Sequence, residues 1–168
     1  NWREVARLKK KYNLPIILKG INHPLDAQKA IDLGIEVVYL SNHGGRQLDQ
    51  SLGSLDLLPE IKAVIGNQAT LMIDGGFYRG TDVVKAIALG ADAVGLGRLQ
   101  GWALAAGGPE ALMQCLKILR HEICETMALC GVTKLSELDP SFVRAAPAVT
   151  EPSVLSAFPL LNLTDQGY

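Results

Sequence analysis

The segment spanning residues 41–49 contains His43 and Arg46, with two glycines between them. An imidazole titrates near neutral pH and can act as a general base, whereas a guanidinium presents a planar pair of donors that suits a carboxylate. Glycines between them let a ligand approach the backbone closely. The segment could therefore bind an organic acid and remove its proton, and the alternative is a polar turn with a hydrogen-bonded histidine. His23 and His121 lack such neighbours, so we expect structural roles for both.

Two further glycine-containing segments could bind an anion. Residues 74–80 combine three glycines with Arg79 ahead of an expected helix, and Gly97-Arg98 follows another apolar run. Small residues expose backbone amides, helix N-termini favour anions, and guanidinium groups add positive charge. The sequence therefore predicts a phosphate site at these two segments. Lys19, at the end of the first apolar run, either places an amine at the mouth of the fold, where the expected strands end, or is an ordinary surface lysine.

The elements that carry these segments alternate between strand and helix. Short runs rich in branched apolar residues predict strands, and apolar residues at helical spacing predict helices. The expected strands cover residues 14–18, 37–40, 69–73 and 93–96, and the expected helices cover residues 26–33, 57–65, 81–89 and 109–129. Helical crossovers return each strand in the same direction, so we expect a parallel sheet. Because the strands are continuously apolar, we expect burial on both faces of this sheet.

An internal repeat accompanies this alternation. Residues in the first half recur 56 positions later: Asp26, Lys29, Ala30, Ile31, Leu33, Gly34, Val38 and Leu40 match Asp82, Lys85, Ala86, Ile87, Leu89, Gly90, Val94 and Leu96. The matches include helix and strand positions alike, so the chain contains two tandem βαβα modules.

Four such units fit either of two α/β folds. One is an open doubly wound sheet, complete in itself as a small domain, and the other is half of a (βα)8 barrel, which needs about 250 residues. Barrels habitually bind phosphate at the loops after their last two strands, which is where residues 74–80 and Gly97-Arg98 fall. We therefore expect the C-terminal half of a TIM (βα)8 barrel, with four βα units and a C-terminal helix.

The chain divides into two expected parts. Residues 1–144 form the half-barrel, and prolines at positions 147, 152 and 159 predict an extended C-terminal tail over residues 145–168. Because the chain opens on Asn1 rather than on Met, we expect it to begin inside a longer gene product.

The composition excludes several classes of partner. The 168 residues contain 16 Lys plus Arg and 17 Asp plus Glu, so the formal charge of -1 provides no basic field for nucleic acid. Every apolar run falls short of the roughly 20 residues that span a bilayer, so we expect no membrane span. Three cysteines without the paired spacing of a metal or redox site predict no metal centre, and buried thiols in a reducing, cytoplasmic compartment.

The motifs together resemble one enzyme family, the FMN-dependent α-hydroxy-acid dehydrogenases, which oxidise lactate, glycolate or mandelate. The residues that carry the resemblance are Lys19, the run 41–49, Asp74-Gly75-Gly76, the run 79–83 and Gly97-Arg98. It extends from about Trp2 to Val143 and covers only the second half of that family's barrel.

The resemblance implies a role for each motif. His43 corresponds to the active-site base, Arg46 to the anchor of the substrate carboxylate and Lys19 to the lysine beside the flavin ring. The implied FMN contacts are Lys19, Ser41, Asp74, Gly75, Gly76, Phe77, Tyr78, Arg79, Gly97 and Arg98. One position departs from the family, since Tyr78 stands where its members commonly carry the first of two adjacent arginines.

The resemblance implies an FMN-dependent oxidase or dehydrogenase that converts a small L-2-hydroxy acid into a 2-oxo acid, as a cytoplasmic homo-oligomer, a tetramer in the family. Two alternatives stay open. The chain is a non-catalytic or incomplete half-barrel, or it belongs to another FMN- or phosphate-binding barrel enzyme in which Arg46 meets phosphate.

Overall fold

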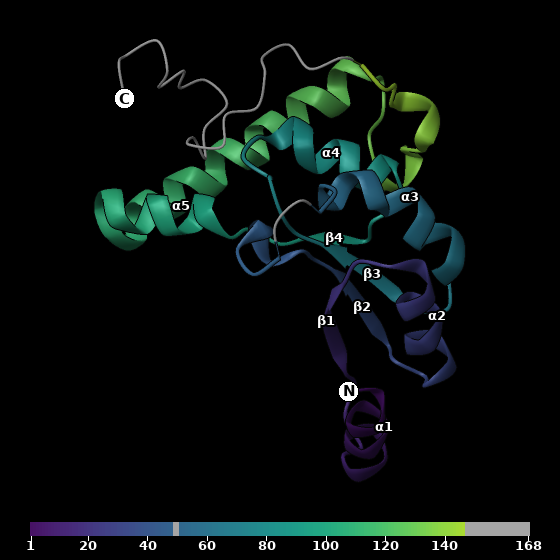
Figure 1. Cartoon of the computed structure of the whole chain (residues 1–168). Helices are drawn as coiled ribbons and strands as arrows, with labels where there is room; N and C mark the ends of the chain where they lie inside the picture. Colours follow the sequence, from purple (N-terminus) through teal and green to yellow (C-terminus); the bar gives the residue numbers. More distant parts are fainter. Residues whose placement is uncertain (49–50, 147–168) are drawn as a thin grey trace.

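A four-stranded parallel sheet forms the centre of the structure, a computed structural model that describes residues 1–48 and 51–146. The strands are β1 (Ile17–Ile21), β2 (Val37–Leu40), β3 (Thr70–Ile73) and β4 (Ala93–Val94). They lie side by side in chain order, and all three pairings are parallel (Figure 1). The expected parallel sheet is thus confirmed, and the carboxyl ends of all four strands lie along one edge.

Helices alternate with these strands. They are α1 (Trp2–Lys11), α2 (Pro24–Asp32), α3 (Ser54–Ile65), α4 (Gly80–Ala88) and α5 (Arg98–Leu129), with short 3-10 turns at His43–Gly45, Leu135–Glu137 and Pro140–Phe142. Local chemistry explains several boundaries. The ring of His23 accepts a hydrogen bond from the Leu25 amide at 3.2 Å ahead of Pro24, and Gly66 adopts a positive φ of 56° at the end of α3.

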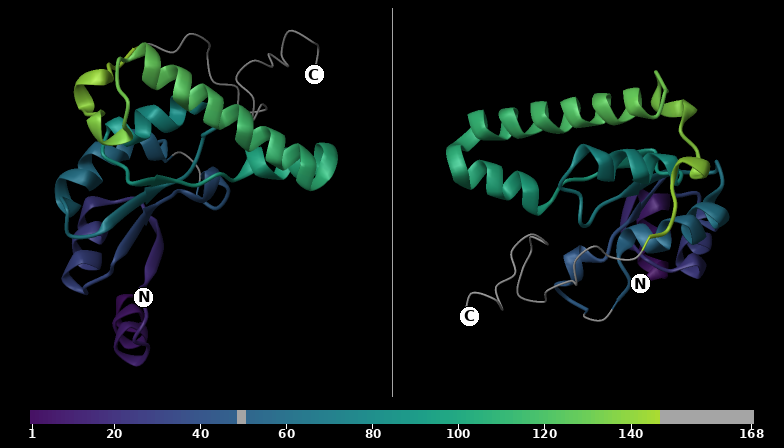
Figure 2. Two further views of the ribbon diagram at one scale, coloured as in Figure 1. Left: turned by 180° about the vertical axis from the view of Figure 1, so that it is seen from behind. Right: turned by 90° about the horizontal axis from the view of Figure 1, so that it is seen from above.

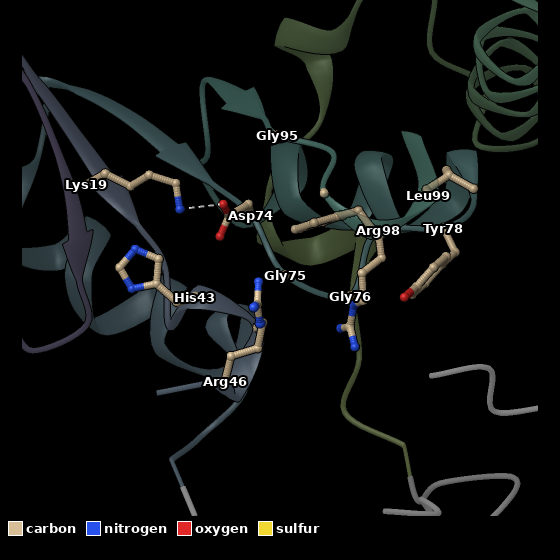
Figure 3. A pocket seen from close by; sticks show the side chains of 13 residues that line it. Lys19, His43, Arg46, Asp74, Gly75, Gly76, Tyr78, Gly95, Arg98 and Leu99 are labelled. Carbon is tan, nitrogen blue, oxygen red and sulfur yellow. Dashed lines mark ion pairs between the residues drawn. The ribbon is translucent and has the colours of Figure 1, made fainter. Parts of the chain in front are cut away.

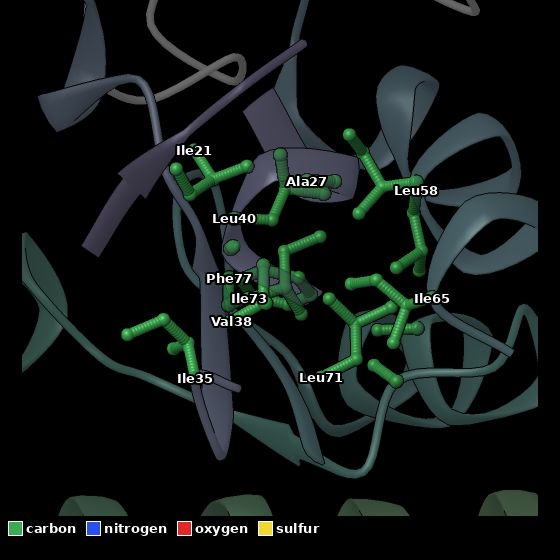
Figure 4. Close-up of a cluster of buried hydrophobic side chains, with 14 residues drawn as sticks. Ile21, Ala27, Ile35, Val38, Leu40, Leu58, Ile65, Leu71, Ile73 and Phe77 are labelled. Carbon is green, nitrogen blue, oxygen red and sulfur yellow. The ribbon is translucent and has the colours of Figure 1, made fainter. Parts of the chain in front are cut away.

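The core lies on one face of the sheet only. Val38, Leu40, Leu71 and Ile73 are fully buried there and pack with apolar side chains of α2 and α3 (Figure 4). Alternate strand positions on the opposite face are at least partly exposed, and Ile17 is 57% exposed. The expectation of burial on both faces is therefore wrong for the described residues. Because the crossovers share one hand, consecutive helices lie on one side of the sheet.

The first strand and the last helix differ most from their expected bounds. The strand expected at residues 14–18 is β1, Ile17–Ile21, so Lys19 lies within the strand rather than after it. The helix expected from Pro109 is the second part of α5, because the backbone breaks at Gly107 and at Gly108, whose φ is 64°. Figure 2 shows how α5 changes direction at this break. Pro109 directly follows these two glycines, and proline is favoured in the first turn of a helix, so it marks where the second part begins.

Helix α1 was not among the expected elements. Its sequence is strongly charged and none of its residues is buried, so it lacks the apolar run that marked the other helices. It attaches to the sheet through Glu36, which pairs with Lys9 and accepts the Ile16 amide at 2.9 Å. Trp2 and Val5 pack against the edge of the core.

Three remaining expectations concern the surface and the termini. Cys124 and Cys130 are exposed and Cys115 is partly exposed, so the expectation of buried thiols is wrong. They lie on α5 and its C-terminal end, which the core covers only in part. No helix in the described ranges is long and apolar enough to cross a membrane. The expected tail lies outside the described residues from position 147 onward, and its boundary stays a prediction.

Candidate functional site

A cavity of about 380 Å³ lies at the carboxyl edge of the sheet, where three of the sequence motifs meet (Figure 3). Its lining consists of Lys19, His43, Gly44, Arg46, Asp74, Gly75, Gly76, Phe77, Tyr78, Gly95, Gly97, Arg98 and Leu99. Loops at this edge of a parallel α/β sheet are where such folds bind ligands. Of the twelve expected site residues, only Ser41 and Arg79 are absent from the lining.

Lys19 is the best-anchored cation of this cavity. Its ammonium lies 2.7 Å from Asp74 Oδ2, 2.6 Å from Ser41 Oγ and 4.6 Å from the centre of the Tyr39 ring. Ser41 itself is only 1% exposed, and its hydroxyl also accepts the His43 amide at 3.2 Å. Ser41 thus positions Lys19 and the His43 segment from beneath the cavity.

Tyr39 is a site residue that the sequence interpretation missed, because the apolar run 37–40 predicts only a strand. Lys19 and Tyr39 are partners in the register of β1 and β2, so their side chains emerge from the same face of the sheet. Burial, and then the charge and hydrogen bond of Asp74, raise the pKa of Tyr39 above its usual value of 10. Successive side chains of a strand point to opposite faces, so a residue aligned with Lys19 on the neighbouring strand shares its face. This alternation is the signal that could have found Tyr39.

The His43 segment adopts an unusual backbone. His43 has a positive φ of 54°, the single such value among described residues other than glycine, and it begins a 3-10 turn that Asn42 caps by accepting the Gly44 amide at 2.9 Å. A β carbon on Gly20 would lie 3.6 Å from His43 Cε1, at a bulge in β1. Sparsely populated backbone conformations persist only where the surrounding structure holds them in place. They are found mainly at functional sites.

Arg46 belongs to the same turn and is exposed at the cavity. It lines the cavity together with His43, and the two side chains lie below Lys19 and Asp74 in the view of Figure 3. A base and a guanidinium on one short turn can contact the same small acid, the base at a proton and the guanidinium at the carboxylate. The structure therefore brings together the pair that the sequence singled out.

The opposite end of the cavity has the character of an anion site. Gly75 and Gly76 adopt positive φ values of 104° and 83°, which L side chains rarely reach, so glycine is required there. Arg98 lies beside them, and Tyr78 also borders this end (Figure 3). Phe77 contacts the cavity but is only 5% exposed and belongs mainly to the core.

Arg79 takes another position than the one expected. Its guanidinium forms an ion pair with Glu122 of α5, with Nη2 at 2.6 Å and Nε at 2.8 Å from Oε1. Glu122 Oε2 also accepts the Gly80 amide at 2.6 Å, and these donors hold the pKa of Glu122 below its usual range. Arg79 therefore joins α4 to α5 and does not line the cavity.

The N-terminus of α4 is likewise occupied by carboxylates of the chain itself. Asp82 Oδ2 accepts the amides of Tyr78 at 3.1 Å and Arg79 at 2.9 Å, and Glu122 accepts that of Gly80. The expectation that this helix end binds an external anion is thus not supported by its hydrogen bonds. Among the lining residues, those that could hold an anion at this end of the cavity are Gly75, Gly76 and Arg98.

The remaining histidines have structural roles, as expected. His23 caps α2, and His121 pairs with Glu125 at 3.1 Å on the exposed face of α5. Within the described part of the chain, no three acidic, histidine or cysteine side chains are placed to hold a metal ion.

Comparison with known proteins identifies relatives of this chain. Residues 1–145 match the family model described as FMN-dependent dehydrogenase. The chain is 43% identical over 142 residues to an L-lactate oxidase of Nostoc sp., covering 84% of this chain and 39% of that protein. It is 46% identical over 138 residues to an L-lactate oxidase of Lysinibacillus sphaericus, covering 82% of this chain and 36% of that protein.

Solved structures give the same result. A mandelate oxidase variant with (S)-mandelic acid matches with a TM-score of 0.79 and 40% identity, over 82% of this chain and 41% of that one. The chain thus spans about two-fifths of the length of such relatives. An α/β fold corresponding to part of a TIM barrel is confirmed.

Proposed function

The chain belongs to the FMN-dependent dehydrogenase family, and from that premise we propose that it supplies the flavin and substrate contacts of an enzyme that oxidises an L-2-hydroxy acid to a 2-oxo acid. Supporting this proposal, Lys19, His43, Arg46 and Arg98 line one cavity at the carboxyl edge of the sheet. The observation that carries the proposal is that His43 and Arg46, the pair suited to an acid, line the same cavity as two further cationic side chains.

The chemistry of the lining residues fits FMN. Glycines at positions 75 and 76 leave backbone exposed where a bulky phosphate needs close approach, and Arg98 provides a fixed positive charge beside them. At the other end, Lys19 offers a cation to the ring system. When bound, FMN supplies the two-electron acceptor for the reaction.

Within this proposal, the His43 imidazole accepts a proton from the substrate and the Arg46 guanidinium binds its carboxylate. Oxidation of a 2-hydroxy acid releases the hydroxyl proton and the hydrogen on the α-carbon together with two electrons, so a base is required. The imidazole of His43, close to the carboxylate-binding guanidinium, provides this base in a fixed place. Lactate and mandelate are substrates named for relatives, and we propose an acid of this class for this chain.

We also propose that the working protein is a homo-oligomer. Large apolar side chains are exposed along α5, including Trp102 at 55%, Met113 at 55% and Ile118 at 50%. Exposed apolar side chains that gather along one element mark association surfaces.

The decisive test is His43→Ala in the FMN-loaded protein. We expect the rate at which an L-2-hydroxy acid reduces the flavin to fall by at least about 10²-fold, the usual effect of losing a general base. Anaerobic stopped-flow absorbance measures this rate, and the flavin spectrum of the same sample shows that FMN remains bound.

His121→Ala is the matched control, since His121 is an exposed histidine far along α5. It should leave the reduction rate unchanged. Equal rates in the wild-type protein and the His43→Ala variant would remove His43 from the mechanism. A protein that binds FMN but is reduced by no 2-hydroxy acid would favour the alternative of a non-catalytic flavin-binding chain.

A further inference from the structure

The Lys19–Asp74 ion pair is built into a cluster with a phenol beneath it. The Lys19 ammonium lies 2.7 Å from the Asp74 carboxylate and 4.6 Å from the centre of the Tyr39 ring. The Tyr39 hydroxyl lies beside Asp74 as well, because a β carbon on Gly95 would overlap that hydroxyl and lie 3.4 Å from Asp74 Cβ, and a hydrogen bond with Asp74 is among the causes that raise the tyrosine pKa. A phenol beside a carboxylate is the donor, because an ionised carboxylate can only accept. Asp74 thus has two donors from two different strands.

Gly95 provides the space for this hydroxyl. A β carbon at Gly95 would overlap Tyr39 Oη and would lie 3.1 Å from Tyr39 Cζ. Gly95 does not adopt a positive φ, so its backbone conformation alone does not demand glycine. Gly95 instead lacks a side chain where the Tyr39 hydroxyl needs the space. Residues 39 and 95 are therefore complementary in size.

We propose that Tyr39 is a positioning residue that sets the charge presented to the flavin by the Lys19–Asp74 pair. The proposal rests on the proposed function, in which Lys19 faces the flavin ring.

The sign of the effect follows from electrostatics. A flavin becomes more negative when it is reduced, so the positive charge of Lys19 favours the reduced form and the negative charge of Asp74 opposes it. By donating to Asp74, the Tyr39 hydroxyl withdraws part of the carboxylate's charge and competes with Lys19 for its oxygens. Without the hydroxyl, Asp74 binds Lys19 more closely and offsets more of its charge, which disfavours reduction.

The experiment measures the reduction potential of FMN bound to the protein, by equilibrium reduction against a reference dye. Tyr39→Phe keeps the ring under Lys19 and removes only the hydroxyl, and we expect a more negative potential. Asp74→Asn removes the opposing charge, and we expect a shift of the opposite sign. Tyr12→Phe, at an exposed tyrosine on the surface, should shift nothing.

A double-mutant cycle with Gly95→Ala makes the test independent of general loss of structure. In the wild-type background the added methyl displaces the hydroxyl, so the potential should shift in the same direction as in Tyr39→Phe. In the Tyr39→Phe background only the contact with the ring remains, so Gly95→Ala should add little.

An unchanged or more positive potential in Tyr39→Phe would overturn the proposal, as would equal Gly95→Ala shifts in the two backgrounds. Failure of the flavin-binding part of the proposed function has a different signature, because the wild-type protein would then bind no FMN. Flavin fluorescence quenching on binding records that outcome separately.

Discussion

Arg79 and Arg98, 19 positions apart, were both expected to bind the phosphate, but they have different roles in the structure. Arg98 lines the cavity, whereas Arg79 is bound to Glu122 and joins two helices. A guanidinium binds whichever carboxylate has the better geometry, and here a carboxylate from α5 reaches Arg79. The anion end therefore retains one arginine, beside Tyr78.

At the carboxylate-binding end, we predict that Arg46→Lys weakens substrate binding although the charge is kept. Lysine lacks the planar fork, so one charge-assisted hydrogen bond of about 1.5 kcal/mol is lost, and the half-saturating substrate concentration should rise about tenfold. Steady-state kinetics measures the change, with Arg120→Lys on the exposed surface of α5 as the control. An unaltered half-saturating concentration would show that Arg46 does not bind the carboxylate.

At the phosphate end, we predict that Tyr78→Arg tightens FMN binding. The variant adds a second guanidinium beside Arg98, and a partly exposed ion pair contributes about 1 kcal/mol, or about fivefold in the dissociation constant. The gain should shrink as salt is raised. Fluorescence titration with FMN measures it, and Tyr12→Arg tests for a nonspecific effect of charge. Weaker binding in the Tyr78→Arg variant would mean that the phosphate lies elsewhere.

At the scale of elements, single carboxylate side chains join neighbouring elements to one another. Glu36 attaches α1 to β1, and Glu122 attaches the start of α4 to α5. Each carboxylate satisfies backbone amides as well as a cation, so it fixes the place of a whole element. The cavity depends on this, since Tyr78 and the glycines before it precede the start of α4.

Glu36 gives this attachment a predictable pH dependence. Its amide and Lys9 partners lower its pKa from 4.5 to about 2. The stabilisation is therefore fully present above pH 4.5 and is lost as the pH falls toward 2. We predict that Glu36→Gln unfolds at a lower temperature than the wild type at neutral pH, and that the difference narrows as the pH falls through this window.

Thermal unfolding followed by circular dichroism across this range measures the difference. Glu60→Gln, at an exposed position of α3, is the control and should show no such narrowing. A difference that persists unchanged at the acid end of the range would contradict the assignment to Glu36.

At the scale of the whole molecule, the sheet has one covered and one uncovered face. The uncovered face carries Lys19 and Tyr39 toward the cavity and Ile17 toward the opposite end. Strand β1 also forms an edge of the sheet in the described residues. Apolar surface and an unpaired edge together favour association between chains.

We therefore predict that the 168-residue chain by itself self-associates and binds FMN weakly. Ile17→Lys places a charge at the edge and on the uncovered face, and should shift the chain toward monomer. Leu25→Lys is the matched control, since Leu25 is 67% exposed but lies on α2. Sedimentation velocity measures the association. A wild-type chain that stays monomeric and binds FMN tightly would show that the uncovered face has no such effect.

Local sequence was sufficient for most of the elements, although not for α1, and for the most exposed chemistry. The strand over residues 37–40 and the second part of α5 follow from short apolar runs and from Pro109, whose signals lie within the element itself. His43, Arg46 and Arg98 were identified because glycine-rich segments at strand ends have few structural uses for such side chains.

Only the tertiary structure decided the roles of Arg79, Tyr39 and Ser41. Glu122, which binds Arg79, is 43 positions away, and Tyr39 meets Lys19 through the register of two strands. Ser41 is buried next to the cavity and contacts Lys19, which precedes the bulge of β1. A side chain's type fixes what it can bind, but its partner depends on how distant elements dock, and local periodicity carries no information about that docking.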